Sequence, residues 1–265
     1  MADPLDDLVA AVMAAPKYAN ITPALVRRIA AAELAKGRGL KDALKATRNK
    51  LHQVGGAYLG GKMDYASWAR RLEDAADEDA LKAECRAMMK THASSRERLP
   101  HLEEFYAVVF GAMGPVTSVL DVACGLNPLA LPWMPPGITY YATDIYTDMT
   151  AFCDAFRERL GRAGRVWASD VLGAPPDVAV DAALVLKTLP CLEQVDKEAG
   201  STLLRSLKAS RIIVSFPVAS LGGRDKGMAS NYSTRFEMLA AEESWQVERL
   251  DTPGELTYLL NTAAA

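Results

Sequence analysis

Apolar residues recur at helical spacing through the first 113 residues of the chain. The first predicted helix starts near Thr22 and Pro23, because a polar residue followed by proline is typical of a helix start. Comparable patterns predict helices within 40–59, 78–92 and 94–113. The apolar residues expected to share one face of the first helix are Ile21, Leu25, Ile29 and Leu34.

Two of these helices carry signals at their ends. Gly55 and Gly56 are expected to end the helix within 40–59, because glycine is a poor helix former. Ser94 is followed three residues later by Glu97, the spacing of a capping box, so a helix is expected to start at Ser94. Pro100 then falls early in that helix, where its missing N–H is best tolerated.

From Thr117 the pattern changes to apolar strands separated by helices, which predicts a doubly wound, mostly parallel sheet. The last two strands are separated only by Thr252–Gly254 and should form an antiparallel hairpin. The fold class expected is therefore an α/β domain over 106–265 preceded by a smaller all-helical domain over 1–105. The predicted strands are 117–123, 138–144, 165–171, 181–189, 211–217, 245–251 and 255–261, with helices over 147–161, 191–209 and 233–243.

Composition limits the classes to which the protein can belong. Of its 265 residues 50% are hydrophobic and 24% are charged, which is typical of a globular protein. No apolar run approaches the roughly 20 residues that span a bilayer. Asp3, Asp6 and Asp7 stand where a signal peptide would be basic, so a cytoplasmic protein is expected. Four cysteines without a CxxC pair and three histidines predict neither a disulfide framework nor a metal site.

Charge is distributed unevenly along the chain. The formal net charge is -3, yet the segment from Lys17 to Lys62 holds ten basic and two acidic residues, a difference of +8. A solvated helix face usually mixes both signs, so this excess favours contacts with nucleic-acid phosphates. The alternative is an ordinary charged helix surface. The candidate phosphate contacts are Lys17, Arg27, Arg28, Lys45, Arg48 and Lys50.

Acidic residues and a glycine follow the first predicted strands. Gly125 lies in the turn after the first strand, Asp144 ends the second strand and Asp170 ends the third. In a doubly wound sheet the ligand lies beyond the carboxyl ends of the strands, and an acidic residue at the end of the second strand can bind ribose hydroxyls. The spacing therefore indicates a crevice for a nucleoside.

The turn after the first strand argues against a dinucleotide. A dinucleotide-binding turn uses three glycines to approach the pyrophosphate, whereas "ACGLNPLA" has Ala123 and Asn127 at two of the comparable positions. A nucleoside with a sulfonium chain, such as S-adenosylmethionine, needs no such loop. Its adenine is expected near Asp170 and Val171. The alternative is that a single glycine after a strand is only a turn.

Several strings resemble the aminoglycoside-resistance methyltransferases that modify N7 of guanine 1405 in 16S ribosomal RNA. They include "LDVACGLNPLAL", "HASSRERL" and "VSFPVASLGGRDKGMASNY", and with others they cover nearly the whole chain. The resemblance implies a helical domain for ribosome recognition, a Rossmann-like methyltransferase domain, S-adenosylmethionine as donor and the assembled 30S subunit as substrate. It also implies resistance to aminoglycosides.

The same resemblance places two candidate residues beside the donor, and the ends of the fourth and fifth predicted strands supply candidates around the base. His92 and Arg98 are expected beside the donor carboxylate, which Arg98 could bind through two parallel hydrogen bonds. Lys187, Phe216 and Met228 are expected near a guanine that has left its stack, with Phe216 stacking on it. For each of these residues the alternative is a structural or solvent-facing side chain. Arg224 and Lys226 lie in a glycine-rich loop expected to close over RNA.

Guanine N7 carries an unprotonated lone pair, so the reaction needs alignment of the reactants and no general base. The absence of a Ser-His-Asp or Cys-His pattern agrees with that chemistry. Alternatives are a methyltransferase for another rRNA base, a nicotinamide-dependent oxidoreductase and a ribosome-binding factor without activity. Nothing in the sequence indicates an obligate dimer, and a monomer is expected.

Overall fold

The computed structural model describes residues 3–56, 63–194, 196–218 and 228–262. Its amino-terminal part is helical throughout, as the periodicity predicts. The predicted helix start at Thr22–Pro23 is confirmed, and Gly56 ends a π-helical turn. The elements are α1 (Pro4–Met13), α2 (Pro23–Leu34), α3 (Leu40–Leu51), a π-helical turn (His52–Gly56), α4 (Tyr65–Glu73), α5 (Glu78–Met89), α6 (Ala93–Arg98), a 3₁₀ turn (Leu99–His101) and α7 (Leu102–Met113).

The carboxyl-terminal part is built on one sheet with the strand order β3-β2-β1-β4-β5-β7-β6. The first five strands are parallel, whereas β7 is antiparallel to both β5 and β6. This confirms the doubly wound sheet and the terminal hairpin. The strands are β1 (Ser118–Val122), β2 (Thr139–Asp144), β3 (Gly164–Ala168), β4 (Ala179–Leu186), β5 (Lys208–Pro217), β6 (Gln246–Leu250) and β7 (Glu255–Asn261).

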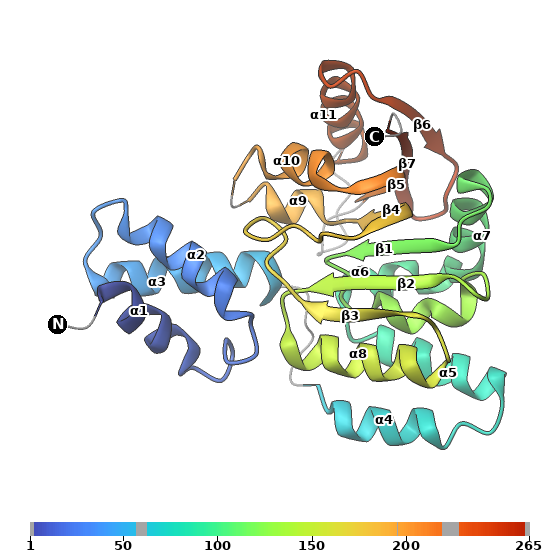
Figure 1. Ribbon diagram of the computed structural model, residues 1–265, viewed down its shortest axis with the longest axis horizontal. Coiled ribbons are helices and arrows are strands. Elements are labelled where there is room, and N and C mark those ends of the chain that lie inside the picture. Colours follow the sequence, from blue (N-terminus) through green and yellow to red (C-terminus); the bar gives the residue numbers. More distant parts are fainter. Residues whose placement is uncertain (1–2, 57–62, 195, 219–227, 263–265) are drawn as a thin grey trace.

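Helices cover both faces of the sheet (Figure 1). Because side chains alternate along a strand, Val119 of β1 joins the core beneath α5 and α7, whereas Leu120 joins the core on the opposite face. The first face also carries α4 and α8 (Thr147–Arg159), and the second carries α9 (Leu189–Leu192), α10 (Ala199–Ser206) and α11 (Met228–Glu242).

Helices α1, α2 and α3 pack on one another and lie beyond the carboxyl ends of the strands (Figure 1). This α1–α3 bundle is joined to the loop after β2 by backbone hydrogen bonds. The N–H of Thr22 donates to the carbonyl of Ile145, and the N–H of Thr147 donates to the carbonyl of Asn20, each over 2.8 Å. Helices α4, α5 and α7 pack with the sheet instead, and the domain boundary at residue 105 stays a prediction.

The predicted single helix over 94–113 is wrong, because it is three separate elements. Pro100 lies in the 3₁₀ turn between α6 and α7, where its missing N–H interrupts the helical ladder. The predicted capping box is also wrong. His92 precedes the first residue of α6, Ser94 lies inside the helix, and the carboxylate of Glu97 binds Lys187 instead of capping the helix.

The turn after β1 leads into a 3₁₀ helix (Asn127–Trp133). Pro128 lies in the first turn of this helix, and Pro132 within it removes a further N–H donor. The Asn127 amide fixes the turn, since its Nδ2 donates to Asp121 over 2.6 Å and its Oδ1 accepts from Tyr106 over 2.6 Å. The side-chain hydrogen bonds of Asn127 therefore hold the turn at the point where this helix begins.

Asp121 yields a prediction about pH. Burial raises its pKa to about 6, although the hydrogen bonds from Tyr140 and Asn127 oppose that rise. Between pH 4 and 6 the unfolded carboxyl loses its proton first, so the stability from Asp121 falls as pH rises. Relative to Asp121→Asn, the wild-type free energy of unfolding should fall by roughly 1–3 kcal/mol over that range in urea titrations. A difference independent of pH would contradict this.

Candidate active site

A pocket lies at the carboxyl ends of β1, β2, β3 and β4, at the position where the strand order reverses. The ends of these strands contribute Ala123, Asp144, Asp170 and Lys187 to its wall. The α1–α3 bundle and the π-helical turn close another side through Leu25, Arg28, Val54 and Gly55. The predicted crevice is thus present, and part of its wall comes from helices that the sequence assigned to another domain.

The turn after β1 has a tight left-handed backbone. Ala123 and Gly125 have φ angles of 53° and 54°. A Cβ atom on Gly125 would lie 2.8 Å from Cε1 of His92, so the imidazole occupies the space that a side chain would need. Glycine is therefore required at 125 both for its conformation and for the close approach of His92.

Asp144 presents a buried carboxylate to the pocket. Its oxygens accept hydrogen bonds from the N–H groups of Gly125 over 2.9 Å and of Ile145 over 2.7 Å. Burial raises the pKa of Asp144, and these backbone donors oppose the rise. A carboxylate fixed in this way still has acceptor positions for hydroxyl groups. The position expected to bind a ribose is therefore equipped to do so.

Asp170 and Arg28 form a bidentate ion pair. Nε of Arg28 lies 2.5 Å from Oδ2 of Asp170, and Nη2 lies 2.8 Å from Oδ1. Asp170 is predicted beside the cofactor and Arg28 on the RNA-binding surface, whereas both side chains line the same pocket. Val171, which follows Asp170, is buried and also lines the pocket.

His92 lies in the pocket wall as a neutral group. Burial, with the nearby cations Lys187 and Arg98, lowers the pKa of His92 to about 4. The hydroxyl of Ser94 lies 3.1 Å from its Nδ1. A neutral imidazole at pH 7 can exchange hydrogen bonds with a ligand, but it does not supply the positive charge expected beside a carboxylate.

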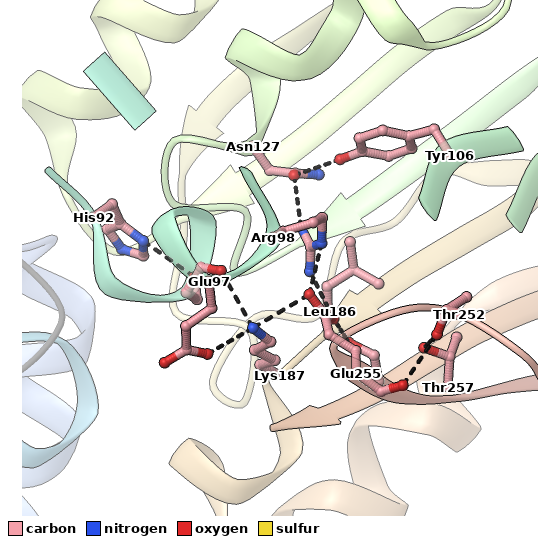
Figure 2. Close-up of polar contacts among 12 residues, drawn as sticks. His92, Glu97, Arg98, Tyr106, Asn127, Leu186, Lys187, Thr252, Glu255 and Thr257 are labelled. Atoms are coloured by element: carbon pink, nitrogen blue, oxygen red, sulfur yellow. Dashed lines mark hydrogen bonds and ion pairs between the residues drawn. The ribbon is translucent and has the colours of Figure 1, made fainter. Parts of the chain in front are cut away.

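The guanidinium of Arg98 binds protein groups, and its predicted contact with the donor carboxylate stays a prediction. Its guanidinium is buried, and it binds Glu255 through two parallel hydrogen bonds of 2.8 and 2.9 Å (Figure 2). Nη1 donates to Asn127 over 3.0 Å. Arg98 therefore forms two parallel hydrogen bonds to a carboxylate, but that carboxylate belongs to Glu255. Arg98 does not line the pocket.

Lys187 is the cation that reaches the pocket from β4. Its ammonium lies 2.7 Å from Glu97 and 3.2 Å from Glu255, and its Nζ donates to the carbonyl of Ser94 over 3.3 Å (Figure 2). Its backbone has a φ of 57°, which is uncommon for a residue with a side chain. The predicted site includes Lys187 but not its partners Glu97 and Glu255.

Phe216 is not part of the pocket wall. Its ring is buried and stacks on Tyr232 with centroids 5.2 Å apart, and Phe236 and Tyr258 complete the cluster. Tyr232 of α11 thus stacks on the ring of Phe216, and stacking of Phe216 on a base stays a prediction. Met228 begins α11. Arg224 and Lys226 lie outside the described residues.

The predicted phosphate contacts lie on or beside the α1–α3 bundle. Lys45 is exposed, and Arg27 is exposed beside Asp6. Arg48 donates to the carbonyl of Ala11 over 2.9 Å, and Lys17 lies 3.2 Å from Nδ1 of His52.

Lys50 belongs to a cluster around Glu33. The buried carboxylate of Glu33 is surrounded by the cations Lys36, Arg38 and Lys50. Burial and the neighbouring cations Lys36 and Arg38 lower the pKa of Lys50. One carboxylate thus gathers two cations of the loop between α2 and α3 and one cation of α3, so an excess of positive charge remains in this part of the bundle.

The fold and the site together define a class. A mainly parallel, doubly wound sheet has a pocket at its switch point with a fixed carboxylate at the end of β2 and no glycine-rich pyrophosphate loop. The crystal structure of the 16S rRNA methyltransferase RmtF in complex with S-adenosyl-L-homocysteine has a TM-score of 0.84 and 34% identity, covering 99% of this chain and 100% of that one. The protein is therefore a Rossmann-like methyltransferase.

Sequence comparisons identify the family. The family model "Ribosomal RNA methyltransferase (FmrO)" matches residues 14–259. A 16S rRNA (guanine(1405)-N(7))-methyltransferase of Micromonospora echinospora is 41% identical over 267 residues, covering 97% of each chain. One of Frankia casuarinae is 42% identical over 252 residues, covering 92% of this chain and 89% of the relative. The chain belongs to the FmrO family of ribosomal RNA methyltransferases.

The left-handed turn yields a prediction for Gly125→Ala. The positive φ and the contact with His92 should together lower the free energy of unfolding by roughly 2–4 kcal/mol, and affinity for S-adenosylhomocysteine should fall as His92 is displaced. Urea unfolding and titration calorimetry measure the two effects. Gly161→Ala is the matched control, because Gly161 has a φ of 65° with no atom within 4 Å of an added Cβ. Equal effects in both variants would contradict a role for the His92 contact.

Proposed function

We propose that this protein transfers the methyl group of S-adenosylmethionine to N7 of guanine 1405 of 16S rRNA and thereby confers resistance to aminoglycosides. The observation that carries the proposal is the match along 97% of the chain to relatives named for this reaction. The pocket at the switch point supports the proposal independently of those names.

The residues of the pocket fit the proposed donor. The carboxylate of Asp144 is fixed for two ribose hydroxyls, and Ala123, at the start of the turn, lines the pocket beside it. Lys187 is proposed to offset negative charge at the donor's amino-acid end or at the RNA. When bound, S-adenosylmethionine supplies an electrophilic methyl group on a sulfonium. No pyrophosphate-binding loop is needed for such a ligand.

In the proposed reaction these residues position the reactants and transfer no proton. Guanine N7 is a hydrogen-bond acceptor without a proton, so a general base is unnecessary. His92 is neutral at pH 7 and fixed against Gly125, which agrees with a binding role. The ammonium of Lys187 is restrained by Glu97 and Glu255. We infer that Lys187 contacts the guanine or a flanking phosphate with little freedom to move.

The α1–α3 bundle is proposed to dock on the ribosomal RNA of the assembled 30S subunit. It lies beside the mouth of the pocket and carries most of the excess positive charge. Phosphate contacts of this kind depend on the shape of the RNA more than on its sequence. We therefore propose that the protein recognises the folded subunit as a monomer and that a naked oligonucleotide is a poor substrate.

We propose that the protein acts in the cytoplasm, where its proposed substrate is assembled. Among the described helices, none combines the length and apolarity required to cross a membrane.

The proposed reaction is tested on isolated 30S subunits. Treatment with enzyme and S-adenosylmethionine should create a borohydride- and aniline-sensitive site, and primer extension should stop next to guanine 1405. The same RNA without ribosomal proteins should react much less. A stop at another nucleotide would instead support a methyltransferase for a different rRNA base, and no stop on the subunit would contradict the proposed function.

RNA docking is tested by Arg27→Glu combined with Lys45→Glu. Both side chains are exposed on the bundle and neither lines the pocket, so affinity for the 30S subunit should fall by roughly ten- to a hundredfold and depend less on salt. Affinity for S-adenosylhomocysteine should stay unchanged in calorimetry. Arg205→Glu with Lys208→Glu makes the same charge change beside the amino end of β5. Equal loss of subunit affinity in both double variants would contradict a specific RNA surface.

A further inference from the structure

The Arg28–Asp170 ion pair joins two parts of the protein to which the proposed function gives different ligands. Arg28 lies on α2 of the α1–α3 bundle, and Asp170 follows β3 in the cofactor pocket. The carboxylate of Asp170 is 4% exposed, whereas the side chain of Arg28 is 33% exposed. A bidentate pair with one buried partner fixes both position and orientation, unlike a surface ion pair.

The geometry leaves Asp170 able to bind a ligand while Arg28 holds it. A carboxylate has about four acceptor positions. Arg28 uses one on each oxygen, and the N–H of Leu172 lies 3.4 Å from Oδ1. An acceptor position therefore remains for a donor inside the pocket, such as an exocyclic amine of a nucleobase. Arg28 then determines where that acceptor points.

Gly173 limits the freedom of the pair from the other side. A Cβ atom on Gly173 would lie 2.7 Å from Oδ2 of Asp170 and 3.5 Å from Cδ of Arg28. The backbone after Asp170 therefore packs closely against the pair, and the carboxylate cannot shift toward it. The absence of a side chain at 173 is part of what holds Asp170 in place.

A second connection links the same bundle to the other pocket loop. Ile21 and Tyr146 form an isolated antiparallel bridge, and the N–H of Thr22 donates to the carbonyl of Ile145. Ile145 and Tyr146 both line the pocket next to Asp144. Thr22 directly precedes α2, so the loops after β2 and β3 are both bonded to one helix, and any movement of α2 is transmitted to both carboxylates.

We propose that Arg28 is a positioning residue of the cofactor pocket, and that through Asp170 it couples cofactor binding to the docking of the α1–α3 bundle on RNA. The identity of the two ligands rests on the proposed function. Binding of the donor fixes Asp170. Because Arg28 is paired with Asp170 and lies on α2, Arg28 and α2 are then also fixed before the RNA binds. Each ligand then strengthens the binding of the other by the same factor, because such coupling is reciprocal.

The first test measures binding of S-adenosylhomocysteine to the full chain by calorimetry, without RNA. Arg28→Gln should weaken binding roughly tenfold, and Arg28→Lys, which keeps one ionic contact, should lie between that variant and wild type. Arg27→Gln is the matched control, since the neighbouring cation on the same helix pairs with Asp6 outside the pocket. Its cofactor affinity should equal that of wild type. Equal affinities in Arg28→Gln and wild type would overturn the proposal.

The second test measures affinity for 30S subunits with and without saturating S-adenosylhomocysteine. Wild type should bind the subunit several-fold more tightly with the ligand than without it. The ratio of these two affinities should be near one in Arg28→Gln. In Arg27→Gln the ratio should equal that of wild type, although both affinities are weaker. If the ligand does not raise the subunit affinity of wild type, or raises that of Arg28→Gln by the same factor as in wild type, the coupling is overturned. Neither test requires methyl transfer, so a protein that passes both but leaves guanine 1405 unmodified would contradict only the proposed reaction.

Gly173→Ala tests the position of the Asp170 carboxylate without changing the charge of Arg28 or Asp170. It keeps both members of the pair but crowds Oδ2 of Asp170, so cofactor affinity should fall while the thermal unfolding midpoint without ligand changes little, as Gly173 is exposed. If the midpoint of Arg28→Gln falls strongly, Gly173→Ala still tests the geometry. Unchanged cofactor affinity in Gly173→Ala would show that the position of Asp170 is unimportant and would overturn the proposal.

Discussion

The site depends on one buried carboxylate, that of Glu255 on the last strand. Arg98 and Lys187 both pair with it, and the hydroxyl of Ser215 donates to it over 2.7 Å. Burial opposes ionisation of Glu255, but the two cations outweigh that effect and lower its pKa. Charges taken out of water are stable only when each is matched. Glu255 thus allows one cation to reach the pocket and the other to reach Asn127, which fixes the turn after β1.

That network supports a backbone that would be unfavourable alone. Ala123 and Lys187 are both in the left-handed region without being glycine, and both line the pocket. Such conformations cost of order 1–3 kcal/mol each and persist where the surroundings hold them. Lys187 is held by Glu97 and Glu255, and Ala123 lies between β1 and the Asn127 hydrogen bonds. Strain in the wall of the pocket is therefore stabilised by charge pairs behind it.

Local patterns predicted what depends on local sequence. Strand and helix alternation predicted the sheet, and the positions of Asp144 and Asp170 at strand ends follow from the fact that parallel strands end at one edge. The partner of Arg98 was not predictable in this way, because Glu255 is 157 residues distant in sequence. Phe216 shows the same limit, because a ring that stacks on a ligand and a ring in the core look alike in sequence. The interruption between α6 and α7 is different, since the missing N–H of Pro100 is a local signal.

The order of the strands has a consequence for biosynthesis. Glu255 reaches its place only when β7 inserts between β5 and β6, and β7 follows the other six described strands of the sheet along the chain. Until then the nascent chain holds the guanidinium of Arg98 and the ammonium of Lys187 without their shared counter-ion. Because domains assemble as synthesis proceeds, the site stays incomplete until β7 has been synthesised, and a chain that lacks β7 is left with unmatched charge at its centre.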